Sequence, residues 1–173
     1  MFFIIQNQSQ KKMFIIKNHK LKTNFSKIVT IQWRRVWPKG RKGQSRILGN
    51  GPKLADKLAS KLPKNILIRL VDTAGLHMRD QIAIIRKTDY LIGIHGAGLS
   101  LSIFMPTTSI FHEIVHLLNL KLLQMMSTLS GHKTYSDQIL YESDTINDSE
   151  YIFFDVNDFS KTIIRRMKEN NFI

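Results

Sequence analysis

The sequence predicts an α/β fold with a doubly wound, Rossmann-like parallel sheet. Apolar, β-branched runs typical of strands alternate about four times with segments whose apolar residues recur at helical spacing. The chain has 173 residues, a length that suits one compact domain. Hydrophobic residues make up 43% of it and charged residues 23%. These fractions are ordinary for a globular protein and argue against wholesale disorder.

Short β-branched or apolar runs predict the strands. The clearest, Tyr90 to Ile94, is nearly all apolar, as expected for a strand buried on both faces. The strands are expected at 28–33, 66–71, 90–94 and 109–115. The helices are expected at 52–62, around Met78, Ile82 and Ile85, at 99–105, at 117–129, and from Asp155 to Lys168. In the last helix, acids open and bases close the segment, which complements the helix dipole.

The remaining segments carry weaker patterns. Residues 132–150 hold turn formers and acids without a period, and they are expected to form a loop. Residues 1–26 are expected to be a poorly specified basic N-terminal arm with room for one short helix. No signal peptide or membrane-spanning run is visible. The predicted domain therefore covers residues 27–173.

The charge is concentrated in the first third of the chain. The net charge is +13, and residues 1–64 hold 16 Lys and Arg against one acid, Asp56. The rest is close to neutral, so the sequence indicates an α/β domain with a basic front end. The chain has no cysteine, which excludes disulfides, thiolate zinc sites and a cysteine nucleophile.

The strongest local motif is a turn of small residues, His95-Gly96-Ala97-Gly98, after the 90–94 strand. A buried strand that opens through glycines into a helix presents backbone amides to an anion such as phosphate. A tight turn without a ligand is the alternative. The spacing matches neither the dinucleotide fingerprint nor the Walker loop. An esterase oxyanion hole would need a G-x-S-x-G elbow, which the sequence lacks.

This turn and its surroundings, residues 80–114, resemble glycosyltransferase family 61. Further segments agree in order: 28–34, 45–48, 129–135 and 154–159. The resemblance covers roughly residues 27–172. Two positions depart from the family pattern, because Ser45 replaces one of two paired basic residues and Gly49 stands where an asparagine is expected.

The resemblance implies the C-terminal, nucleotide-binding half of an inverting GT-B enzyme, which moves a sugar from a UDP sugar to a protein or glycan acceptor. It implies that the small-residue turn cradles the diphosphate, that two arginines supply positive charge, and that a glutamate accepts hydrogen bonds from the ribose hydroxyls. These residues are His95, Gly96, Ala97 and Gly98, then Arg34 and Arg46, then Glu113.

The same resemblance sets the expected limits of this activity. No D-x-D motif is present, so no metal cofactor is expected beside the UDP-sugar donor. The N-terminal half of a GT-B enzyme has no room in 26 residues, so a partial enzyme is expected and the general base stays unassigned. The resemblance also implies the endoplasmic reticulum lumen or the secretory pathway.

Several alternatives stay open. The chain could be a non-catalytic nucleotide-binding fragment. The basic stretch 34–46, with its tryptophans, could be a solvated loop or a nucleic-acid patch. His112 and His116 flank Glu113 at the spacing of one helical turn, but a zinc site would need a helix and a third ligand. Asp72 and His77 follow a predicted strand, and they either belong to a ligand site at the end of the sheet or cap the next helix.

Overall fold

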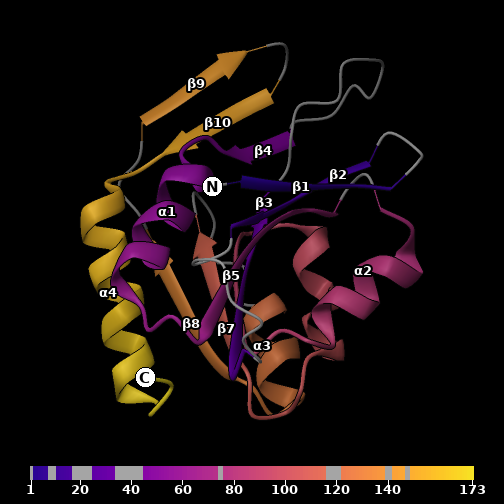
Figure 1. Ribbon diagram of the computed structural model, residues 1–173, viewed down its shortest axis with the longest axis vertical. Coiled ribbons are helices and arrows are strands. Elements are labelled where there is room, and N and C mark those ends of the chain that lie inside the picture. The colour runs from indigo at the N-terminus through magenta and orange to yellow at the C-terminus, as the bar shows by residue number, and fades with distance from the viewer. Residues whose placement is uncertain are drawn as a thin grey trace.

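The computed structural model describes residues 2–7, 11–16, 25–33, 45–73, 76–115, 122–138, 142–146 and 149–173. A seven-stranded sheet forms its centre, in the order β1-β2-β5-β3-β6-β7-β8 (Figure 1). The strands are β1 (Phe2–Asn7), β2 (Lys11–Ile16), β5 (Ile66–Asp72), β3 (Lys27–Trp33), β6 (Tyr90–Ile94), β7 (Ile110–Val115) and β8 (Lys133–Gln138). The five strands from β5 to β8 are parallel, whereas β2 pairs antiparallel with both β1 and β5.

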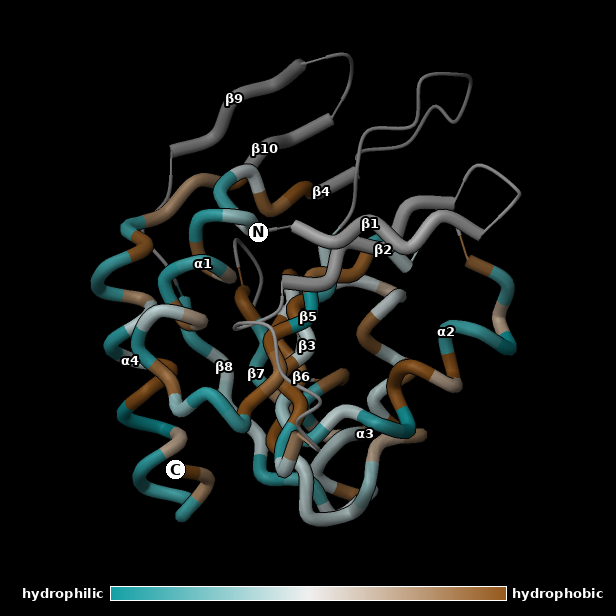
Figure 2. The backbone as a smooth tube through the Cα atoms, in the orientation of Figure 1, coloured by the Kyte–Doolittle hydropathy of each residue, from teal (hydrophilic) through white to brown (hydrophobic). Residues whose placement is uncertain are grey.

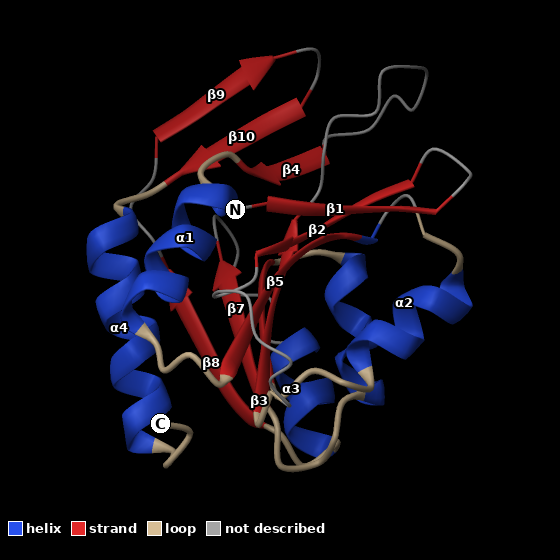
Figure 3. Cartoon of the chain, viewed as in Figure 1, coloured by secondary structure: helices blue, strands red, loops and turns tan. Residues whose placement is uncertain are grey.

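Helices cover both faces of the sheet, which confirms the doubly wound α/β prediction (Figure 3). On one face lie α1 (Gly51–Lys61) and α4 (Val156–Glu169), and on the other lie α2 (Met78–Ile85), the 3-10 helix η2 (Ala97–Phe104) and α3 (Leu122–Leu129). The α3 helix confirms the later part of the helix expected over 117–129, and the earlier part lies outside the described residues.

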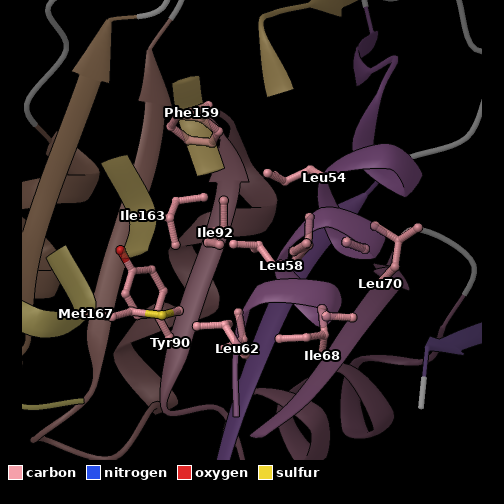
Figure 4. Close-up of a cluster of buried hydrophobic side chains, with 14 of the residues drawn as sticks. Leu54, Leu58, Leu62, Ile68, Leu70, Tyr90, Ile92, Phe159, Ile163 and Met167 are labelled. Carbon is pink, nitrogen blue, oxygen red and sulfur yellow. The ribbon is translucent and has the colours of Figure 1, made fainter. Parts of the chain in front are cut away.

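The larger core lies between the sheet and the pair α1 and α4. Figure 4 shows side chains of both helices meeting those of β5 and β6. They include Leu54 and Leu58 from α1, Leu62 directly after it, Phe159, Ile163 and Met167 from α4, and Ile68, Leu70, Tyr90 and Ile92 from the strands. Apolar residues concentrate along the central strands, and hydrophilic ones occupy much of α1 and α4 (Figure 2). The helical spacing read from the sequence is therefore the buried stripe of each helix.

The expectation of a loop over 132–150 is wrong. Strand β8 begins at Lys133, and β9 (Glu142–Ile146) and β10 (Ser149–Phe153) form a second sheet with β4 (Ser45–Leu48), in the order β4-β10-β9. Strand β8 is at the edge of the large sheet and most of its side chains are partly or fully exposed. Such a strand is held by backbone hydrogen bonds to β7, so it needs no apolar pattern that a sequence would reveal.

The short helix for which residues 1–26 left room is not found in the part of that segment that the structure describes. Two strands, β1 and β2, lie in that segment and extend the large sheet beyond β5. The two apolar bursts of the sequence, Phe2 to Ile5 and Met13 to Ile16, fall on these strands. The division of the chain after residue 26 stays a prediction.

A chain of polar side chains links β6, β7 and β8 beneath α4. The Tyr90 hydroxyl lies 2.8 Å from Nδ1 of the fully buried His112, and Nε2 of His112 lies 2.8 Å from Oδ2 of Asp137. Because a carboxylate only accepts, Nε2–H of His112 donates to Asp137, and with the proton on Nε2 alone Nδ1 accepts from the Tyr90 hydroxyl. The hydrogen bond from His112 lowers the pKa of Asp137, and nearby Arg166 adds a smaller effect in the same direction.

Asp137→Ala is expected to lower the free energy of unfolding by about 1–3 kcal/mol, because the buried Nε2–H of His112 then has no acceptor. Asp137→Asn keeps an oxygen at that position and should cost less. The lowered pKa of Asp137 means that its contribution is present above the ordinary value of 3.8 and is lost as the pH falls through the folded-state pKa. Urea unfolding at pH 7 and pH 3 measures both effects. Equal losses for Ala and Asn would contradict this account.

Candidate functional site

The order of the parallel strands creates a switch point between β3 and β6. From β3 the chain passes to β5 on one side of it, and the later strands β6, β7 and β8 follow on the other side. In open α/β sheets, ligands bind outside the carboxyl ends of the strands at such a point. The carboxyl ends here are Trp33 of β3 and Ile94 of β6, and His95 follows directly.

The turn after β6 is fixed by backbone hydrogen bonds on both sides. The His95 N–H donates to Ile114 O of β7 over 2.9 Å, and the Leu99 N–H donates to Gly96 O over 2.9 Å. This second bond is the first of η2, so the N–H groups of Ala97 and Gly98 come before the helix begins to pair its own amides. Helix N-termini of this kind favour anions.

The three glycines of this region differ in what a side chain would meet. A Cβ on Gly98 would lie 2.5 Å from Nε2 of Gln32, and one on Gly93 would lie 2.6 Å from Cδ2 of Leu99. Among the described residues, a Cβ on Gly96 would meet only Ile94 O, at 3.9 Å, and the φ angle of Gly96 is an extended 165° that any residue adopts. A side chain at Gly93 or Gly98 would therefore displace the end of the Leu99 or Gln32 side chain, whereas the described residues leave the space at Gly96 open for the close approach of a ligand.

Gln32 is a residue of the site that the sequence reasoning missed. It lies one position before the end of β3, and its Nε2–H donates to Oγ1 of Thr73 over 2.8 Å. The same side chain packs against the positions of Gly93 and Gly98. Gln32 thus joins the carboxyl ends of β3 and β5 to the start of η2. The available signal was a polar side chain near the end of an otherwise β-branched strand, close to the predicted ligand edge.

Glu113 holds His95 from the neighbouring strand. Oε1 of Glu113 lies 2.6 Å from Nδ1 of His95, and the side chain of Glu113 is 1% exposed against 17% for His95. The other carboxylate oxygen, Oε2, is buried with no hydrogen-bond partner among the described residues. Burial raises the pKa of Glu113, and the hydrogen bond to His95 opposes that rise.

The structure thus brings His95, Gly96, Ala97, Gly98 and Glu113 together at one edge of the sheet. The carboxylate of Glu113 is turned toward His95, so its expected contact with ribose stays a prediction.

The structure gives only partial information on Arg34 and Arg46, the two arginines of the expected site. Arg34 and the side chain of Arg46 lie outside the described residues. The backbone of Arg46 belongs to β4, and Nε1–H of Trp33 donates to Leu48 O of that strand over 3.1 Å. This bond places β4 beside the carboxyl end of β3, and β4 also contacts β6.

The described contacts do not support the alternative sites that the sequence left open, which are a metal site at His112 and His116 and a cap or ligand site at His77. Both ring nitrogens of His112 face Tyr90 and Asp137, and His116 lies outside the described residues. Within the described part of the chain, no three His, Asp or Glu side chains are grouped to hold a metal ion. His77 occupies the N-cap position of α2, but its side chain makes no capping hydrogen bond.

Comparison with known families decides the family. The model of the family described as Glycosyltransferase 61 matches residues 3–111, which is more than half of the chain and includes the turn His95 to Gly98. The chain belongs to glycosyltransferase family 61. The resemblance read from the sequence is therefore confirmed for the family. A search of curated proteins found no match to this glycosyltransferase 61 chain.

The match places the small-residue turn inside the family region and Glu113 just beyond it. Membership identifies the chain as a glycosyltransferase, which acts on a sugar donor and an acceptor. Of the helices that the structure describes in this glycosyltransferase 61 chain, none has the length and apolar character needed to cross a bilayer.

Proposed function

We propose that this glycosyltransferase 61 chain binds a UDP sugar at the turn after β6 and transfers the sugar to a protein or glycan acceptor with inversion. One observation carries the proposal. The amides of Ala97 and Gly98 begin η2 at the switch point of the sheet, and no described residue fills the space at Gly96. That combination suits a diphosphate, which needs N–H donors and close backbone approach.

In the proposed reaction, the acceptor hydroxyl attacks the anomeric carbon from the face opposite the leaving group, which inverts that centre. The bond between the anomeric carbon and the diphosphate oxygen breaks, and its electron pair passes to that oxygen. The turn amides, with Arg34 and Arg46, compensate the negative charge that develops there. The acceptor proton passes to a general base that we do not assign. No metal cofactor is part of this proposal.

The donor sugar and location follow from the finer resemblance of the motif. Within family 61, we infer from the turn and its flanks a resemblance to the EGF-domain-specific O-linked N-acetylglucosamine transferase. N-acetylglucosamine is therefore the proposed sugar, and the endoplasmic reticulum lumen or the secretory pathway is the proposed location. A transfer assay with UDP-N-acetylglucosamine separates this enzyme from a chain that binds nucleotide without catalysis.

A titration calorimetry experiment separates the proposal from nucleic-acid binding. We expect the purified chain to bind UDP in preference to ADP and GDP. A single-stranded oligonucleotide serves as the competing ligand, because the basic stretch 34–46 and the net charge of +13 favour a polyanion. Both titrations are made at low and high salt. No UDP binding, together with oligonucleotide binding that falls steeply with salt, would contradict the proposal and support a nucleic-acid partner.

A further inference from the structure

His95 is held to β7 at two points. Its backbone N–H donates to Ile114 O over 2.9 Å, and its ring nitrogen Nδ1 lies 2.6 Å from Oε1 of Glu113. Ile114 and Glu113 are consecutive in β7, so the backbone and the ring of His95 are both hydrogen-bonded to the same part of one strand. Glu113 pairs in register with Gly93, two residues before His95. The next residue after His95 is Gly96, whose open space is proposed to admit the diphosphate.

The environment of Glu113 argues against direct contact with a ligand. Its side chain is 1% exposed, one oxygen is engaged by His95 and the other is buried. A ribose hydroxyl would have to enter the protein interior to reach either oxygen. His95 is the more exposed member of the pair, at 17%, and it adjoins the turn amides. Glu113 can therefore affect a bound ligand only indirectly, by way of the imidazole ring of His95.

The chemistry of the pair defines what the ring offers. A carboxylate accepts hydrogen bonds, so the proton of the bond lies on Nδ1, and any contact of the ring with a ligand uses Nε2. A carboxylate behind an imidazole fixes the tautomer and the orientation of the ring. Such a ring beside helix-start amides is suited to the oxygens of a diphosphate.

We propose that Glu113 is a positioning residue that keeps the proton on Nδ1 of His95 and directs Nε2 to the diphosphate of the bound nucleotide. The proposal rests on the proposed function and replaces the ribose contact expected of Glu113. It makes His95 a ligand contact whose alignment depends on a side chain that touches no ligand.

The first test compares UDP with uridine, because uridine has the ribose but no phosphate. Glu113→Gln is expected to lower UDP affinity about tenfold, which corresponds to about 1.4 kcal/mol, and to leave uridine affinity unchanged. His95→Asn should lower UDP affinity by a similar factor, and the double variant should lose little more. Asp137→Asn is the matched control, since it alters the other His–carboxylate pair, and it should leave UDP affinity unchanged. Equal losses for UDP and uridine in Glu113→Gln would overturn the proposal.

The second test needs no nucleotide and uses ¹⁵N NMR of the histidine rings in the full chain. In the wild type, the His95 signals should show the proton on Nδ1. In Glu113→Gln they should change while those of His112 do not. A wild-type ring with its proton on Nε2 alone would overturn the proposal, even if UDP binds. Wild-type protein that binds no UDP would overturn the proposed function, and the ring signals would still decide whether Glu113 sets the tautomer.

Discussion

Gly96→Asp is expected to reduce UDP affinity at least about 100-fold, or about 2.7 kcal/mol, while the chain stays folded. Of the atoms that the structure describes, the added Cβ would meet only Ile94 O, at 3.9 Å, and the extended backbone at Gly96 suits any residue. The new carboxylate would stand where the diphosphate is proposed to lie and would repel it. Calorimetry measures the affinity, and urea unfolding confirms the stability.

Gly96→Asn is the matched control, because it adds nearly the same volume without charge. It should lower UDP affinity less than Gly96→Asp does, and the difference between the two reports the charge of the ligand. UDP binding by Gly96→Asp at wild-type strength would place the nucleotide elsewhere. Equal losses for Asp and Asn would show that bulk rather than phosphate charge decides binding at Gly96.

Gly98→Ala is expected to destabilise the fold by about 1–3 kcal/mol, because it overpacks the start of η2. Its Cβ would lie 2.5 Å from Nε2 of Gln32, and that nitrogen cannot move away without weakening its hydrogen bond to Thr73. Urea unfolding measures the effect. Gly96→Ala is the control in the same turn and should change stability little, since its Cβ has no close contact with any described residue.

The clash also predicts a rescue. Gln32→Ala removes the side chain that the methyl group added by Gly98→Ala would strike, so the double variant should lose less stability than the sum of the two single variants. Coupled sites of this kind depart from additivity by about 0.5–3 kcal/mol. Strict additivity of the losses in stability would show that the Gln32 side chain does not support the turn at Gly98. Titration of the same variants with UDP shows whether this contact also affects nucleotide binding at the turn.

The sequence predicted the elements that carry a strong apolar pattern. The strands β3, β5, β6 and β7 and the helices α1, α2 and α4 are found where β-branched runs or helical spacing indicated them. The strands that were missed have weaker patterns. Strand β8 is at an edge and none of its side chains is fully buried, so hydrogen bonding to β7 decides its conformation and no periodic burial marks it. In β1 and β2, short apolar bursts gave too little pattern to choose between strand and helix.

The site was predictable only in part, for a related reason. The turn of small residues after a buried strand is a local feature, so the position of the proposed diphosphate site could be predicted from the local sequence. The contacts that hold it are not local. Gln32 meets Thr73 across 41 positions, and His95 meets Glu113 across 18. Both depend on the register of neighbouring strands, which pairs Gly93 with Glu113 and Trp33 with Asp72.

The most direct test of the central claim is an NMR titration of the ¹⁵N-labelled chain with UDP, which follows every backbone amide at once. If the diphosphate is held at the start of η2, the largest shifts will belong to the amides of Gly96, Ala97 and Gly98, and uridine will leave them nearly unmoved. Shifts confined to the basic stretch 34–46, or no shift at the turn when UDP binds, would contradict the account.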